Sequence, residues 1–369
     1  MNVLLAGAHF TPAVAVIEVL KDLPNIKLVY VGRKTTLEGD PSLSAESQVL
    51  PKLGVKFIPI TTGRLQRNLS FYTFISLLKI PVGFVQSFFI IVKEKPDVLL
   101  SFGGYVSVPL VIVAWLFSIP IIVHEQTMVS GLANKISAIF ADKIAYSFSV
   151  KKFSKKEVLT GNPLRGEIIN YKDVILTEGF EKIIYFARNK KLPLVLVTGG
   201  NQGSHTLNVL IEKSLEELLK TCCIIHQTGD SNFKDYDRLR FYQTDRYLPV
   251  KFIGNGIGKL IKYSDLVVSR AGANTLIELS FFEKPAIVIP LPYLYQDEQN
   301  KNADYFEKLG LVQKIPQKDL NNADSLVKKI KECLKDLESL NQKAKGARQV
   351  VFKDAAKRLA IETISLVNR

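Results

Sequence analysis

The 369-residue sequence contains only three cysteines, Cys222, Cys223 and Cys333. Adjacent cysteines cannot form a CxxC metal knuckle, and an odd total argues against a disulfide framework. The pattern therefore fits a reducing compartment. No basic segment precedes the first apolar run, so a secretory signal is not indicated.

Sequence motifs for hydrolytic and metal-dependent chemistry are missing as well. There are four histidines, none within an HExxH motif, and there is no GxSxG nucleophile elbow. His9, His124 and His205 lie at expected strand ends or helix starts, whereas His226 falls inside an expected strand and is interpreted as structural. Hydrolase and metalloenzyme functions are therefore not favoured.

The charge is strongly unbalanced, with 49 Lys and Arg against 35 Asp and Glu, a net charge of +14. Such a surplus attracts nucleic acid, anionic lipid or phosphorylated substrates. Zinc-finger spacing and a basic patch interleaved with aromatic residues are both missing, so nucleic acid is not an expected partner. The length favours two domains.

Apolar runs alternate with amphipathic segments along the chain, which predicts buried parallel sheets of α/β type. The expected strands are 2–7, 26–32, 97–102, 120–124, 143–147, 192–199, 223–229, 250–254, 265–270 and 285–290. The expected helices include 11–22, 107–117, 205–220, 273–283 and a last helix over about 347–367, which is compatible with packing on either domain.

The elements form two series, each opening with a strand, a glycine turn and a helix: LLAGAHFTP (4–12) and LVTGGNQGSHTLN (196–208). The first series ends at GNPLRGEI (161–168). We therefore expect two Rossmann-like, doubly wound domains separated by a cleft.

The segment 71–92 has Lys79 as its only charge and is long enough to cross a bilayer. Pro81, Gly83 and Gln86 argue against a span, and cations surround the segment. A membrane-surface patch is favoured, with core helices and a true span as alternatives. The patch is expected to include Phe74, Leu77, Leu78, Lys79, Phe84 and Phe88.

The strongest local motif is TGGNQGSHTLN (198–208). Its glycines allow backbone amides to approach an anion at the start of a helix. It matches neither GxGxxG nor GxxxxGK[ST], so classical NAD binding and P-loop activity are not favoured. A tight structural turn is the alternative.

The richest segment is 269–303. Gly272 permits a sharp turn, a helix is expected to start near Asn274 or Thr275, and Glu278 could accept hydrogen bonds from a ribose diol. The alternative for Glu278 is a capping or surface acid. Further on, the amides of Gln299 and Asn300, after Asp297, suit sugar hydroxyls, or simply form a polar loop that heads a helix.

Three further stretches belong to the first series. SFGGYVSVP (101–109) is a glycine turn after a strand, and HEQTMVSGLANK (124–135) begins at the carboxyl end of another strand, where α/β sites form. GNPLR (161–165) places Arg165 at the junction of the domains, where it either clamps a phosphate or is a solvated charge.

Taken together, FGGYVSVP, IPIIVHEQTMVSGLANK, GNPLR, TGGNQGSHTLN, SRAGANTLIE and DEQNKNA resemble the MurG family in order and spacing over about residues 1–350. These N-acetylglucosaminyltransferases complete lipid II in bacterial peptidoglycan synthesis. The resemblance implies the glycosyltransferase B fold, with an N-terminal acceptor domain (1–163), a donor domain (164–345) and a C-terminal segment (346–369) that packs back on the first domain.

The resemblance also implies the reaction and the partners. UDP-N-acetylglucosamine donates the sugar, lipid I accepts it with inversion, and no tightly bound metal or other cofactor is expected. The enzyme would be peripheral on the cytoplasmic face of the plasma membrane, against its anionic surface, where cell-wall assembly proteins are possible partners.

Site residues are carried over by motif. His9 is implied as the catalytic base. The implied donor residues are Arg165, Asn201, Gln202, Ile253, Ala273, Asn274, Thr275, Glu278, Gln299 and Asn300. The implied acceptor residues are Ala8, Thr11, Gly103, Gly104, Tyr105, His124, Glu125, Gln126 and Thr127.

Three motifs depart from the usual family pattern. The loop GGTGGHxxP becomes the shorter AGAHFTP, HEQN or HESD becomes HEQT with Thr127, and GGSQGA becomes GGNQGS with Asn201. Besides an active transferase, two hypotheses remain: a related enzyme with a different lipid acceptor, and a non-catalytic UDP-sugar-binding protein.

Overall fold

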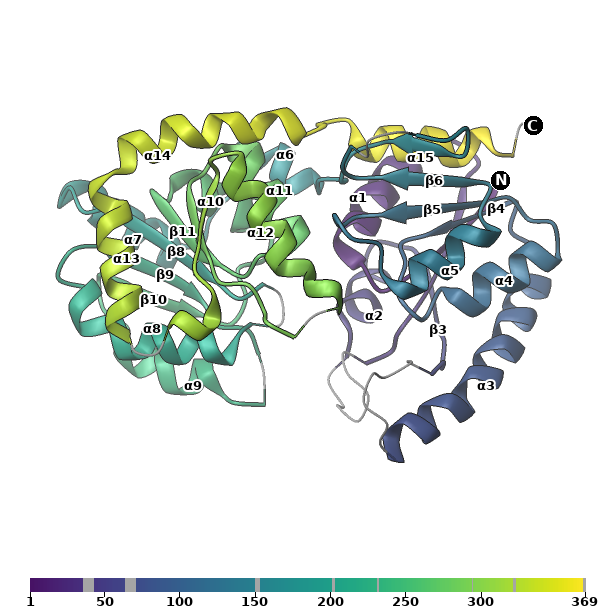
Figure 1. The fold of residues 1–369 in the computed structure, drawn as a ribbon, viewed down its shortest axis with the longest axis horizontal. Helices are drawn as coiled ribbons and strands as arrows, with labels where there is room; N and C mark the ends of the chain where they lie inside the picture. The colour runs from purple at the N-terminus through teal and green to yellow at the C-terminus, as the bar shows by residue number, and fades with distance from the viewer. Residues whose placement is uncertain are drawn as a thin grey trace. The chain divides into compact units, whose positions relative to one another are not determined.

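The computed structural model describes residues 1–35, 43–63, 71–149, 153–200, 203–230, 232–293, 295–320 and 323–367. The chain divides into two compact units. The first comprises 1–165 together with 352–369, and the second comprises 166–351. Each is an α/β unit built on one parallel sheet (Figure 1).

The sheet of the first unit has the order β3-β2-β1-β4-β5-β6-β7, with all neighbours parallel. Its strands are Asn2–Ala6 (β1), Lys27–Gly32 (β2), Lys56–Pro59 (β3), Val98–Ser101 (β4), Ile121–Glu125 (β5), Lys143–Tyr146 (β6) and Glu157–Leu159 (β7). Its helices are Phe10–Lys21 (α1), Ala45–Val49 (α2), Phe71–Glu94 (α3), Val108–Leu116 (α4), Leu132–Phe140 (α5) and Ala355–Ser365 (α15).

Both faces of this sheet are buried, because successive strand residues point to opposite sides. Val3 and Leu5 of β1 belong to the core on one face, with residues of α1 and α15. Leu4 and Ala6 belong to the core on the other face, with residues of α3 and α4. This two-sided burial explains why the strands are continuous apolar runs.

The sheet of the second unit has the order β10-β9-β8-β11-β12-β13, again parallel throughout. Its strands are Leu194–Thr198 (β8), Cys223–Gln227 (β9), Tyr247–Val250 (β10), Leu266–Ser269 (β11), Ala286–Val288 (β12) and Val312–Lys314 (β13). Its helices are Gly166–Ile169 (α6), Glu178–Asn189 (α7), His205–Leu218 (α8), Asp235–Leu239 (α9), Ile257–Tyr263 (α10), Ala273–Phe282 (α11), Glu298–Lys308 (α12), Ala323–Lys335 (α13) and Leu337–Ala344 (α14).

The predicted strand at 250–254 is wrong. The strand β10 ends at Val250, and Phe252 beyond it is exposed. Pro249 argues against a strand in the sequence, because proline lacks the N–H that a strand donates to its neighbour. It is tolerated in β10 because β10 is the outermost strand of the sheet. The strands β3, β7 and β13, of four, three and three residues, were not predicted either.

The last predicted helix, over about 347–367, is also interrupted. A 3-10 helix ends at Val350, and α15 begins at Ala355. Between them Phe352 packs against Gly161, where a Cβ would lie 2.7 Å from the Phe352 ring. The helix α15 then contributes Leu359 and Ala360 to the core that α1 also lines.

The segment 71–92 lies in one helix, α3, with Pro81 inside it. Its buried side includes Ile90 and Ile91, while Phe88 and Phe89 are exposed. Among the residues that the structure describes, no helix is both long enough and apolar enough to cross a membrane.

Candidate functional site

The strand order of the second sheet reverses between β8 and β11, and ligands of open α/β sheets bind where the order reverses, at the carboxyl ends of the strands. The glycine loop after β8 contains Gly199, Gly200 and Gly203, and leads into α8. The turn after β11 contains Gly272 and leads into α11. Two helix N-termini therefore lie at this edge, without an acidic residue in the first turn of either helix.

Arg270 joins the two turns. Its Nε donates to Ser204 Oγ at 2.9 Å, and Ser204 is the N-cap of α8. One terminal nitrogen of Arg270 donates to the carbonyl of Ile289 at 3.0 Å and to Gln317 Oε1 at 2.9 Å. Burial lowers the pKa of Arg270 to about 10, so it remains charged at neutral pH. Sequence reasoning missed this role, although an arginine directly after an apolar strand is a usable signal.

Gln227, at the end of β9, connects the glycine loop to a third loop at the carboxyl ends of the strands. Its Nε2 donates to the carbonyl of Gly200 at 2.9 Å and to Thr198 Oγ1 at 3.3 Å. Its Oε1 accepts the backbone N–H of Ile253 at 3.0 Å. Gln227 was not among the predicted site residues, because nothing local in CIIHQTG distinguishes it from a strand end. It links the glycine loop to Ile253, which is itself buried.

The glycine loop needs its glycine at Gly203. The residue has φ +73°, and a Cβ there would lie 2.1 Å from the carbonyl oxygen of Thr228. Asn201 and Gln202, which were predicted to complete this loop, lie outside the described residues.

The other predicted donor residues of this unit lie on α11 and α12 or just before α10. Ala273 is the first residue of α11, with Asn274 and Thr275 half-buried after it, and Glu278 on the same helix is 6% exposed. The helix α12 carries Gln299 and Asn300.

The start of α12 is backbone-strained. Gln296 and Asp297 both adopt left-handed φ values, 49° and 59°. Gln299 Oε1 accepts the N–H of Leu291 at 2.9 Å, and Asn300 Nδ2 donates to Asp297 Oδ1 at 2.6 Å. Such strain is tolerated where surrounding contacts hold a loop, and it gathers at functional sites.

The first sheet reverses its order between β1 and β4, and the predicted acceptor loops meet there. Ala8 N donates to the carbonyl of Gly103 at 2.9 Å. A Cβ on Gly104 would lie 2.6 Å from the Cβ of Ala8, so a glycine is required for this approach. The hydroxyl of Tyr30 donates to the carbonyl of Gly7 at 3.0 Å. Tyr105 lies beside these turns and is half-buried.

His9 is the N-cap of α1 and makes no capping hydrogen bond with its side chain. Burial, with a contribution from the charge of Arg33, lowers the pKa of His9 to about 4. The imidazole is therefore neutral at pH 7, as a general base must be. Thr11, on the first turn of α1, is half-buried.

The HEQT stretch is held by hydrogen bonds to buried side chains of the first unit. His124 is fully buried, and burial lowers its pKa to about 3. Its Nε2 lies 3.1 Å from Ser147 Oγ. The carboxylate of Glu125 accepts from Asn134 Nδ2 at 2.9 Å and from Thr127 Oγ1 at 3.1 Å.

The HEQT residues are also buried, which affects the pKa of the carboxyl group of Glu125. Burial raises the pKa of Glu125 above its usual range despite its donors. Gln126 and Thr127 are also buried, at 6% and 8% exposure. The structure therefore places this motif mainly inside the first unit.

Arg165 is the last residue of the first unit's main segment and is half-buried. The other predicted donor residues belong to the second unit. Of the four histidines, His226 is fully buried and its Nδ1 lies 2.9 Å from Tyr247 OH, a structural position. His205 Nδ1 lies 2.9 Å from Asp235 Oδ1, and its ring stacks on Phe233.

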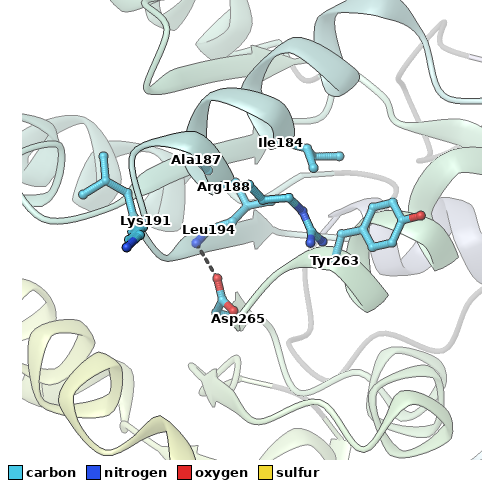
Figure 2. A pocket seen from close by; sticks show the side chains of 8 residues that line it. Ile184, Ala187, Arg188, Lys191, Leu194, Tyr263 and Asp265 are labelled. Carbon is cyan, nitrogen blue, oxygen red and sulfur yellow. Dashed lines mark hydrogen bonds between the residues drawn. The ribbon is translucent and has the colours of Figure 1, made fainter.

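A hollow of about 200 Å³ lies at the amino ends of the strands of the second sheet, opposite the glycine loop (Figure 2). Asp265 Oδ2 accepts the N–H of Leu194 there at 2.7 Å, at the amino ends of β11 and β8. Arg188 lies over the ring of Tyr263. The position at the amino ends of the strands separates this hollow from the switch point.

The part of the chain that the structure describes contains no group of three or more His, Cys, Asp or Glu side chains arranged to hold a metal ion. The three cysteines are buried and unpaired, and burial raises the pKa of Cys222 to about 12 and that of Cys223 to about 11. These thiols are therefore unsuited to nucleophilic chemistry.

Comparison with known proteins supports this organisation. The N-terminal domain model of glycosyltransferase family 28 matches residues 6–146, and the C-terminal domain model matches residues 194–359. Solved structures with a similar fold include MurG of Acinetobacter baumannii (TM-score 0.71, 21% identity, 99% of both chains) and MnaA of S. aureus with UDP (TM-score 0.67, 16% identity, 96% of this chain and 94% of that one).

Curated relatives are closer in sequence. The chain is 35% identical over 328 residues to the UDP-N-acetylglucosamine–N-acetylmuramyl-(pentapeptide) pyrophosphoryl-undecaprenol N-acetylglucosamine transferase of Clostridium botulinum strain Hall, covering 88% of this chain and 87% of that protein. The enzyme of the same name from Clostridium tetani is 35% identical over 319 residues, covering 85% and 84%. The fold is thus the two-domain glycosyltransferase B fold, and the chain belongs to the MurG family of glycosyltransferases, within glycosyltransferase family 28.

Proposed function

We propose that this protein transfers N-acetylglucosamine from UDP-N-acetylglucosamine to the undecaprenyl-diphosphate-linked muramyl-pentapeptide, lipid I, and so forms lipid II. The observation that carries the proposal is the relationship to the clostridial transferases, which extends through both units. The loops gathered at the switch point of each sheet supply matching chemistry.

The second unit would bind the donor. In this proposal the amides at the start of α11, from Ala273 to Thr275, face the diphosphate, where the helix dipole favours negative charge. Glu278 accepts hydrogen bonds from the ribose hydroxyls, and Ile253 lies against the uracil. Gln299 and Asn300 contact the transferred sugar. Arg165 adds positive charge near the donor phosphates.

The first unit would bind the acceptor, and His9 would act as general base. The acceptor hydroxyl attacks the anomeric carbon as its proton passes to the neutral imidazole of His9. The bond from that carbon to the diphosphate oxygen breaks, and UDP leaves with the electron pair. The amides at the start of α11 stabilise the charge that develops on the diphosphate.

The first unit would also dock on the anionic cytoplasmic face of the plasma membrane as a peripheral enzyme. Phe88 and Phe89 of α3 are 46% and 64% exposed, and Trp115 and Leu116 of α4 are 50% and 66% exposed. The ring of Phe88 lies 5.8 Å from that of Phe117, so the two helices share this apolar surface.

Of the predicted patch residues, Leu78 is 62% exposed, Lys79 is half-buried and Phe84 packs on the core. The side chains of Phe74 and Leu77 lie outside the described part.

The test of the reaction is a radiolabelled transfer assay with UDP-N-acetylglucosamine and lipid I. We expect labelled lipid II from the wild-type protein, and much less from His9→Ala and Glu278→Ala. Tight UDP binding without transfer to any lipid would instead identify a binding protein. Transfer to diacylglycerol or another polyprenyl acceptor, with none to lipid I, would replace the acceptor in this proposal.

The test of membrane docking is co-sedimentation with vesicles of phosphatidylglycerol and phosphatidylcholine. Phe89→Ser should lower the bound fraction several-fold, because it removes apolar surface from the interface. Phe241→Ser is the matched control, since Phe241 is 79% exposed on the second unit. Equal loss in both variants would contradict a docking surface on α3.

A further inference from the structure

Arg33 lies at the carboxyl edge of the first sheet, beside the loop that carries His9. It follows β2 directly, and β2 pairs with β1 up to Ala6 and Val31. The N–H of Gly7 continues this pairing to the carbonyl of Val31 at 3.3 Å. The backbone of Arg33 is held in place by the hydroxyl of Ser44, which donates to its carbonyl at 2.5 Å.

The guanidinium of Arg33 lies near Glu46 and is partly open to solvent. Its Nε lies 3.7 Å from Glu46 Oε1, which is longer than a hydrogen bond, and its side chain is 24% exposed. Glu46 is buried, and burial raises the pKa of its carboxyl. The positive charge of Arg33 reaches the imidazole of His9, where it contributes to the low pKa. Tyr30, held to the carbonyl of Gly7, is neutral.

The His9 loop itself offers an anion little. It contains a single glycine, Gly7, so few backbone amides can converge on one ligand. A side-chain cation on this side would therefore add to what the adjoining Gly103–Gly104 turn can offer a diphosphate. Arginine suits this task, because its planar fork forms two parallel hydrogen bonds to phosphate oxygens.

We propose that Arg33 binds the diphosphate of the polyprenyl-linked acceptor and so places the acceptor hydroxyl beside His9. This inference rests on the function proposed above and adds a residue that none of the sequence motifs identified. The alternative is that Arg33 only balances the buried charge of Glu46. The two roles predict different results when both residues are changed.

The experiment is steady-state kinetics with lipid I as the varied substrate. Arg33→Met should raise the KM for lipid I at least about tenfold, as expected for loss of charge-assisted hydrogen bonds, and leave the KM for UDP-N-acetylglucosamine within about twofold. Lys34→Met is the matched control, because Lys34 is the next residue, is exposed, and should change neither constant.

The double variant Arg33→Met with Glu46→Gln separates the two roles. If Arg33 binds the acceptor, the double variant keeps the raised KM. Recovery of a wild-type KM in the double variant would overturn the proposal, and so would an unchanged KM in Arg33→Met. The pH dependence of kcat is a further readout. Without the charge of Arg33 the pKa of His9 rises, so the fall of kcat at low pH should begin at a higher pH than in the wild type. The other titratable groups near His9, which are Tyr30, Glu46 and His124, are unchanged in Arg33→Met.

Inorganic pyrophosphate binding tests Arg33 without turnover. Calorimetry is performed with the donor site saturated by UDP. Arg33→Met should weaken pyrophosphate binding about tenfold, while Lys34→Met should not. Absence of lipid II from the wild-type protein would refute the proposed function, whereas equal pyrophosphate affinity in wild type and Arg33→Met would refute only the role of Arg33.

Discussion

Replacing Gln227 by methionine should disconnect two loops of the proposed donor site. The glutamine side chain forms three hydrogen bonds, to Gly200, Thr198 and Ile253. Methionine has a similar length and can fill the same space, but it offers neither a good donor nor a good acceptor. The substitution therefore removes the connection without removing the volume.

The magnitude follows from the lost contacts. A neutral hydrogen bond contributes about 1 kcal/mol net, and a buried group left without a partner costs about 1–3 kcal/mol. Gln227 is 4% exposed, and the N–H of Ile253 would lose its partner. We expect the free energy of unfolding to fall by about 2–3 kcal/mol. A further loss of about 1.4 kcal/mol in binding, from the disordered loops, would weaken UDP affinity about tenfold.

Two measurements on the same variant separate these effects: urea unfolding for stability and calorimetry for UDP binding. Asp265→Ala is the matched control. Asp265 accepts the N–H of Leu194 at the opposite edge of the same sheet (Figure 2). The control should lose about 1–2 kcal/mol of stability and leave the Kd for UDP within about twofold.

The reasoning fails in either of two ways. If Gln227→Met is destabilised but binds UDP like the wild type, Gln227 has a structural role only. If neither stability nor binding changes, its three hydrogen bonds do not contribute as the geometry implies.

Three further predictions follow from single residues. His9→Ala should lower kcat at least about tenfold, and wild-type kcat should stay level from neutral pH to about pH 5 and fall below that, because protonation near the pKa of about 4 removes the base. Gly203→Ala should lower the free energy of unfolding by about 2–4 kcal/mol in urea titrations, because its Cβ would lie 2.1 Å from the Thr228 carbonyl at a left-handed φ. Glu94→Gln should lower the free energy of unfolding by about 1 kcal/mol at pH 7, because a hydrogen bond from Lys56 holds the pKa of Glu94 below 4.5. This stabilisation is present above pH 4.5 and is lost as pH falls through the folded-state pKa.

Each of these predictions has a control. Unchanged turnover in His9→Ala would remove His9 from the mechanism. Gly54→Ala has a similar φ of +72° with nothing within 4 Å, so it should cost only about 1 kcal/mol. A cost as large as that of Gly203→Ala would contradict the steric argument. For Glu94, a difference from Glu94→Gln that stays constant from pH 7 to pH 3 would show that the carboxylate charge is not involved.

Much of the architecture could be predicted because its causes are local. Apolar strands such as Val3 to Ala6 are buried on both faces and therefore indicate a parallel sheet with helices on either side. Glycine turns after strands, as at Gly7 and Gly199, marked where each series begins. The strand prediction failed near β10, because Pro249 argued against the edge strand that is there and the apolar residues after Val250 suggested a strand that is not.

The candidate site was predictable only in part. Helix starts such as Ala273, with Glu278 five residues further along the helix, follow from motif and period. The partners of those residues do not, because they come from distant positions. Arg270 lies 66 residues from Ser204, and Gln227 lies 26 residues from Ile253.

The pattern of apolar runs, glycine turns and helix starts was sufficient to indicate two doubly wound units and the loops that carry chemistry. Strand order was not in that pattern, and strand order is what brings β1 beside β4 and β8 beside β11. The hydrogen bond of Arg270 to Ser204 forms only because β8 and β11 are neighbours, and those of Gln227 form only because β9 lies between β8 and β10. The charge of Arg33 lies beside His9 only because β2 pairs with β1. Hydrogen bonds and charges act over a few ångströms, so their partners are specified by packing in space and not by separation along the chain.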